Sequence, residues 1–178
     1  GSPSIVARMM EKGHLPNLKA IAKRGTWGVL NSTVPPMTPA AWTTMVSGIE
    51  PDSHGVLDFR RLRKDRSAEL VNGSMAKAKA IWEIASEHGL RCIVINVPFT
   101  YPPKPVNGVL ISGMDTPSSE SDFVYPGELK AGVLDSGYIF EPDQVSNPKS
   151  PSGDYQEVLL RSISARARHA NSSCCYQA

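Results

Sequence analysis

Cysteines, long apolar runs and excess charge are all scarce in this sequence, and each scarcity excludes a class of protein. The 178 residues include three cysteines, an odd number and too few for a disulfide scaffold. No apolar run approaches the roughly 20 residues that cross a bilayer. The formal net charge is only +2, which argues against a dedicated nucleic-acid binder. We therefore expect a cytoplasmic protein with neither a membrane nor a nucleic acid as partner.

Glycine and proline, by contrast, are frequent, with 14 and 15 residues, and they mark where helices begin and end. Proline in a first turn followed by helical spacing and a terminal glycine predicts the early helices, and apolar periodicity predicts the later ones. The predicted helices cover residues 3–12, 16–24, 39–47, 77–88, 128–135 and 154–169. β-Branched or continuous apolar runs predict strands at residues 26–34, 56–60, 68–71, 90–97, 109–112 and 138–140.

Helices that alternate with buried strands predict an α/β fold with a mainly parallel sheet flanked by helices. Residues 90–97 are almost continuously apolar, the pattern of a strand that is covered on both faces. We expect one domain over residues 3–170. The polar residues 171–178, which include Cys174 and Cys175, are expected to form a disordered tail.

The segment around Thr38 carries the strongest chemical signal. Thr38 and Pro39 are a good N-cap and first-turn pair, so a hydroxyl is expected among unbonded N–H groups at the positive end of a helix. The backbone N–H groups of Thr38, Ala40 and Ala41 would then form an anion site for a phosphate or sulfate. A threonine hydroxyl is a poor nucleophile without a metal or base. The alternative is that Thr38 is only a helix cap.

Three further groups each have a functional and a structural interpretation. Asp52 and His54 place a carboxylate and an imidazole close together, either as metal ligands or as parts of a turn. Residues 60–66 hold five basic side chains, either a contact for a phosphorylated or acidic partner or a solvated loop. Asp115 follows a predicted strand, where ligand groups often lie in α/β folds, but a turn or helix-cap role is the alternative.

Taken together, several segments resemble the type I phosphodiesterase/nucleotide pyrophosphatase family of the alkaline phosphatase superfamily. Thr38, Ser47-Gly48 and the run from Pro51 to Gly55 fall where that family has its nucleophile, a Thr/Ser-Gly step and a Pro-x-x-His-Gly motif. Further matching segments are Leu15-Pro16-Asn17-Leu18, Gly25-Thr26-Trp27-Gly28, Ala80-Ile81-Trp82-Glu83, residues 96–103, Val106-Asn107-Gly108 and Ser112-Gly113-Met114. The resemblance covers residues 4 to about 168 and corresponds to the N-terminal part of the family's domain.

The resemblance implies an alkaline-phosphatase-like fold and a metal-dependent hydrolase of phosphoric esters that acts on a phosphorylated small molecule. It implies that Thr38, as an alkoxide on one metal ion, attacks phosphorus and forms a covalent intermediate that water resolves. Two divalent ions, usually zinc, stabilise the attacking oxygen and the leaving group in the family. Thr38 is the one residue of this sequence that the resemblance places at the metals.

The sequence departs from the family at its metal ligands. The family's first metal-binding Asp precedes the helix that starts here near Pro3, and its other Asp and His ligands lie well downstream. Ala41 occupies the position of a phosphate-binding Asn in nucleotide pyrophosphatases. We therefore expect an incomplete domain that binds no metal by itself. The alternative function is a non-catalytic, anion-binding or oligomerising module, and unpaired sheet edges predict a homo-oligomer.

Overall fold

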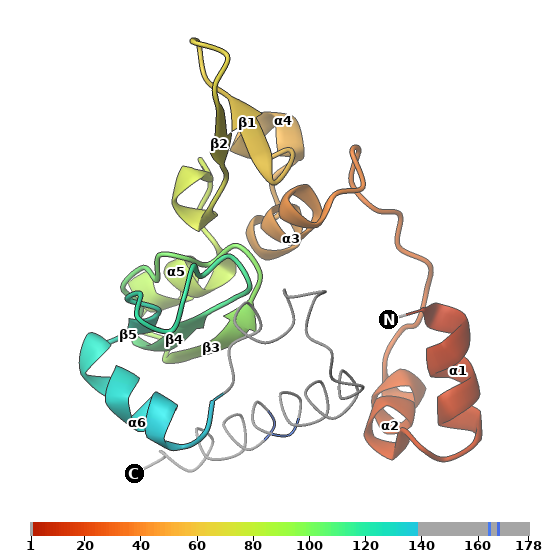
Figure 1. Ribbon diagram of the computed structural model, residues 1–178. Helices are drawn as coiled ribbons and strands as arrows, with labels where there is room; N and C mark the ends of the chain where they lie inside the picture. The colour runs from red at the N-terminus through yellow and green to blue at the C-terminus, as the bar shows by residue number, and fades with distance from the viewer. Residues whose placement is uncertain (1, 139–163, 165–166, 168–178) are drawn as a thin grey trace, which may run out of the picture. The chain divides into compact units, whose positions relative to one another are not determined.

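The computed structural model describes residues 2–138 together with residues 164 and 167 (Figure 1). The chain divides into two compact units, residues 1–31 and residues 32–178. Three predicted segments lie wholly or partly outside the described residues: residues 139–140 of the strand predicted at 138–140, most of the helix predicted at 154–169, and the tail predicted at 171–178. Within the described part, no helix is long and apolar enough to span a membrane.

The first unit consists of two short helices, α1 (Pro3–Glu11) and α2 (Pro16–Arg24). Both begin with proline in the first turn, as predicted, because proline has no N–H to lose there and its φ suits a helix. Gly13 ends the first helix with a φ of 79°, and its N–H donates to the carbonyl of Met10. The two helices pack against each other.

The prediction of a strand at residues 26–34 is wrong. These residues form no strand, and among the described residues no segment pairs with them. Val29 is 98% exposed, and Leu30 and Val34 are almost equally so. β-Branched side chains favour a strand only where a neighbouring strand and a packed face receive them, and neither is provided here.

The second unit starts with α3 (Thr38–Ser47) and α4 (Pro51–His54), which pack against each other. Gly48 and Gly55 end these helices in the left-handed conformation, with φ values of 70° and 79°. Any residue other than glycine would have a strained backbone at either position, so both helices end where glycine occurs.

A separate antiparallel hairpin follows, made of β1 (Arg60–Leu62) and β2 (Ala68–Leu70). The second strand matches the prediction, but the first lies later than the predicted residues 56–60. Arg61 pairs with Glu69, and the turn is closed by a hydrogen bond from the N–H of Arg63 to the carbonyl of Ser67, 2.8 Å long. Residues 63–67 therefore form the turn. The first strand pairs directly before this turn, at residues 60–62, and so lies later than predicted.

The main sheet has the order β3-β4-β5, with β3 (Cys92–Val97), β4 (Gly108–Ser112) and β5 (Val124–Tyr125). The 3-10 turn η1 (Gly73–Met75) and helix α5 (Ile81–Glu87) precede it in the chain. β3 and β4 are parallel, with Val94 opposite Leu110, whereas β4 and β5 are antiparallel. The α/β class is confirmed, but the described sheets are small and only partly parallel.

The core of this unit lies on both sides of β4. One cluster joins the sheet to α6 (Lys130–Asp135), which follows the 3-10 turn η2 (Gly127–Leu129); its members are Ile111, Phe123, Val124, Val133 and Tyr138. The other contains Val94, Val106 and Leu110, with Trp82 packed against it. Ile93 on β3 remains 50% exposed, so the prediction that residues 90–97 are covered on both faces is wrong for the described structure. Tyr138 is not in a strand.

Candidate functional site

Thr38 is the first residue of α3 and not its cap. Met37, with φ −100° and ψ 143°, is the last extended residue before the helix, and the start of the helix has no side-chain cap hydrogen bond. A capping hydroxyl belongs to the residue that is not yet helical, so the shift of one residue removes Thr38 from that role. The expected helix cap is therefore wrong, and the Thr38 hydroxyl remains available for other contacts.

The first turn of α3 contains two N–H groups that have no hydrogen-bond partner among the described residues. The N–H of Ala41 donates to the carbonyl of Met37 at 2.9 Å and is thus engaged in the helix. Pro39 has no N–H, and within the described residues the N–H groups of Thr38 and Ala40 make no hydrogen bond. Ala40 is fully buried. Such unsatisfied donors at the positive end of a helix favour an anion or an ordered water as partner.

His54 is fully buried and links α4 to α3. Its Nδ1 accepts a hydrogen bond from the N–H of Val56 at 3.1 Å, and its Nε2 lies 3.0 Å from Oγ1 of Thr44. Because Nδ1 is an acceptor, the neutral ring carries its proton on Nε2 and donates it to Thr44. Burial lowers the pKa of His54, against smaller raising effects from the backbone of Ala40 and from nearby carboxylates. Both ring nitrogens are engaged, so the turn interpretation holds for His54.

The described residues do not fit a two-metal centre. Asp52 is exposed, and its carboxylate accepts a hydrogen bond from Ser53 at 3.1 Å. Across residues 2–138, no group of three or more His, Cys, Asp or Glu side chains is arranged to hold a metal ion.

Asp115 holds two loops together at the carboxyl end of β3 and β4. Its carboxylate accepts hydrogen bonds from the N–H groups of Tyr101 at 2.9 Å, Thr100 at 3.2 Å and Gly73 at 3.4 Å. Burial raises the pKa of Asp115, although these hydrogen bonds act in the opposite direction. Asp115 lies in a turn, but its carboxylate bonds to residues up to 42 positions away in sequence, which neither the turn nor the helix-cap interpretation predicts.

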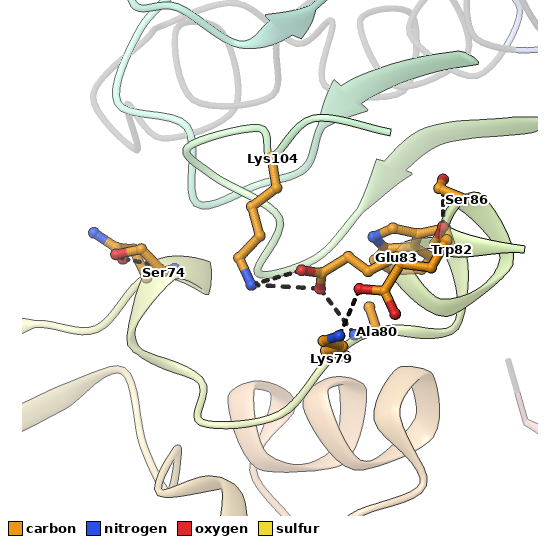
Figure 2. Close-up of polar contacts among 9 residues, drawn as sticks. Ser74, Lys79, Ala80, Trp82, Glu83, Ser86 and Lys104 are labelled. Atoms are coloured by element: carbon orange, nitrogen blue, oxygen red, sulfur yellow. Dashed lines mark hydrogen bonds and ion pairs between the residues drawn. The ribbon is translucent and has the colours of Figure 1, made fainter. Parts of the chain in front are cut away.

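A small cleft, lined mainly by apolar side chains, lies between α3 and the loops that Asp115 holds. Its volume is about 40 Å³, enough for one or a few water molecules. Its polar lining residues are Thr43, Ser47, Glu83, Thr100 and Lys104. Figure 2 shows Lys104 reaching Glu83, whose carboxylate lies 3.0 Å from the ammonium and also accepts the N–H of Ala80 at 2.9 Å. Thr38 is absent from the lining, so this cleft is not part of the candidate site at the start of α3.

The second unit is thus a mixed α/β fold with a hydroxyl and unbonded N–H groups at the start of α3. The model of one family, type I phosphodiesterase/nucleotide pyrophosphatase, matches residues 2–164, and the chain belongs to this family. The resemblance in sequence is thereby confirmed. Comparison with curated proteins and with solved structures gives no significant match.

Proposed function

We propose that this chain carries the phosphoryl-binding and nucleophile segment of a phosphoric ester hydrolase. The proposal is supported by family membership and by the first turn of α3, where the Thr38 hydroxyl lies beside unbonded N–H groups. Ala40 is fully buried, so the Thr38 N–H is the group that donates to a non-bridging oxygen of the phosphoryl group. The positive end of α3 stabilises its negative charge.

In the proposed reaction, the Thr38 hydroxyl attacks phosphorus. A bond forms between Thr38 Oγ1 and phosphorus while the ester P–O bond breaks, and water later releases the phosphoryl group from Thr38. The hydroxyl must lose its proton during the attack, and no described residue makes a hydrogen bond to Thr38 Oγ1 that would receive it. Metal ions supply this activation in the family; the described residues do not hold them.

The proposed substrate is a small phosphorylated molecule. Position 41 is alanine, whose side chain offers no hydrogen bond to a phosphate, and its N–H is engaged with Met37. We therefore do not extend the proposal to the specificity of nucleotide pyrophosphatases.

A second candidate is an anion-binding module that catalyses no reaction. It uses the same N–H group of Thr38, and it is favoured by the lack of a metal-ligand group among residues 2–138. The codons that flank this sequence in its gene discriminate between the two candidates. An upstream strand ending in Asp and downstream His ligands would support the hydrolase.

Phosphate binding at α3 tests both candidates. In ¹H–¹⁵N spectra titrated with inorganic phosphate, we expect the largest shift at the amide of Thr38. Thr38→Val retains the N–H groups, so its affinity should stay within about threefold of the wild type, whereas Thr38→Pro removes one charge-assisted bond and should weaken binding about tenfold. Met37 is already extended, as a residue before proline must be. Shifts that avoid the Thr38 amide would contradict the proposal.

Turnover is the second measurement. With bis(p-nitrophenyl) phosphate and added Zn²⁺, we expect negligible hydrolysis by this chain alone, because the described residues provide no metal-ligand group. Robust zinc-dependent hydrolysis that Thr38→Ala abolishes would overturn this expectation and would make the chain a complete hydrolase. Equal hydrolysis by both proteins would instead point to a contaminant.

A further inference from the structure

The β1–β2 hairpin has one apolar face that nothing in the described structure covers. Cross-strand partners share a face, and Arg60 pairs with Leu70 while Leu62 pairs with Ala68. Leu62 and Leu70 are 75% and 70% exposed. Two exposed leucines are unfavourable in water. A two-stranded hairpin is also only marginally stable unless one of its faces packs against another element. The face is therefore suited to be covered by another surface.

The same hairpin is strongly basic. Its two acidic residues are already engaged: Glu69 pairs with Arg61 at 2.6 Å and with Arg63, and Asp65 accepts hydrogen bonds from Ser67. The hydrogen bond from Arg63 lowers the pKa of Glu69 most, and the hydrogen bond from Arg61 lowers it further. Among the described residues no ion pair involves the remaining cations, Arg60, Lys64 and Arg66. The surface that would cover this hairpin must therefore be apolar and acidic.

One surface of the same chain has this chemistry. The segment formed by η2 and α6 exposes two leucines, Leu129 and Leu134, and two carboxylates, Glu128 and Asp135. Its single cation, Lys130, lies 5.6 Å over the ring of Phe123 and donates to the carbonyl of Glu120. No described ion pair involves Glu128 or Asp135. Among the described residues, the η2–α6 segment, with exposed leucines and unpaired carboxylates, thus complements the hairpin, with exposed leucines and unpaired cations.

We propose that the hairpin surface (Arg60, Leu62, Lys64, Arg66 and Leu70) docks on the α6 surface (Glu128, Leu129, Leu134 and Asp135) of a second copy of this chain. Two hairpins would repel each other, so the contact joins unlike surfaces. It is therefore head-to-tail and can continue from copy to copy. The contact buries few leucines and its charges lie at the surface. The association is therefore weak, and its affinity falls as the salt concentration rises.

A charge-swap experiment tests this contact. One variant carries Arg60→Glu and Lys64→Glu, the other Glu128→Lys and Asp135→Lys, and association is measured by sedimentation velocity at low and high salt. Each variant alone should associate about tenfold more weakly than the wild type, because like charges now face each other. An equimolar mixture should regain wild-type association, since the reversed hairpin of one variant meets the reversed α6 surface of the other.

A control separates the contact from net charge. Lys19→Glu with Lys23→Glu changes two exposed lysines of α2 and alters the net charge as much as the hairpin variant does. It should associate like the wild type. The proposal is overturned if the wild type is monomeric at several hundred micromolar and low salt. It is also overturned if the mixture stays as weak as its components, or if the α2 variant is weakened equally. Because each variant leaves Thr38 unchanged, phosphate binding at α3 provides an independent check on the proposed function.

Discussion

Gly113→Ala is expected to lower the free energy of unfolding by about 3 kcal/mol or more, because it forces apart two strand ends that touch through their backbones. A Cβ at this position would lie 2.0 Å from the carbonyl oxygen of Val97 and 2.9 Å from Cα of Pro98. Both are backbone atoms at the end of β3, so no side chain can rotate away. The β3–β4 pair must separate locally to admit one methyl group.

The same residue belongs to the polar network at the carboxyl end of the sheet. The N–H of Gly113 donates to Oγ1 of Thr100 at 2.9 Å, and this hydroxyl donates to the carbonyl of Val97 at 2.7 Å. Asp115 then holds the N–H of Thr100. Displacing Gly113 would therefore strain buried hydrogen bonds as well as strand packing, which adds to the loss.

Gly132→Ala is the matched control. Gly132 lies in α6, and a Cβ there meets nothing within 4 Å. Alanine should stabilise that helix by up to about 1 kcal/mol. Urea unfolding followed by circular dichroism should thus show a lower midpoint for Gly113→Ala and an equal or higher one for Gly132→Ala. Equal midpoints for Gly113→Ala and the wild type would show that the β3–β4 contact is looser than described.

Local signals in the sequence predicted most of the helices. α1, α2 and α3 begin with proline in the first turn, and α5 ends before Gly89, whose φ is 76°. These signals work because they act through the chain's own φ angles and missing N–H groups, without distant partners. β3 and β4 were predictable for a related reason, since continuous apolar runs need burial wherever they lie.

The errors lie where a partner far along the chain decides the outcome. Residues 26–34 have the composition of a strand, yet the described residues offer them no neighbour. β5 has two residues and exists because Val124 and Tyr125 pair with β4. Asp115 was recognised as following a strand, but its partners at Gly73, Thr100 and Tyr101 follow from the tertiary fold. Periodicity contains no information about such contacts.

The candidate site shows the same division. The position of Thr38 at the start of a helix was predicted within one residue, because proline and glycine mark both helix ends. Which N–H groups stay unbonded depends on where the first helical hydrogen bond forms, and this bond engages Ala41. A shift of one residue therefore leaves two unbonded N–H groups in place of the expected three, and one of these two belongs to the fully buried Ala40.

His54→Ala is expected to lower the free energy of unfolding by about 3 kcal/mol at pH 7, since it removes a fully buried ring and leaves two polar groups without partners. Those groups are the N–H of Val56 and the hydroxyl of Thr44. Thr44 lies on α3, so the variant should also loosen the helix that begins with Thr38. Amide shifts of α3 in the absence of phosphate would report this change.

The effect of His54 should depend on pH in a defined direction. Burial lowers the pKa of His54 in the folded protein, whereas the unfolded chain titrates near the ordinary value of 6.5. Below pH 6.5, His54 becomes protonated in the unfolded state while it stays neutral in the folded state. The stability due to neutral His54 is therefore fully present above 6.5 and is lost as the pH falls, by at most about 1.4 kcal/mol per pH unit.

The difference in stability between the wild type and His54→Ala should consequently be larger at pH 7 than at pH 5. His14→Ala removes an exposed histidine and should change stability by no more than about 0.5 kcal/mol at either pH. Urea unfolding at both pH values measures all three proteins. A difference that grows toward pH 5 would mean that the folded protein holds His54 protonated. The Nδ1 contact with Val56 would then be incorrect, because a protonated ring nitrogen cannot accept a hydrogen bond.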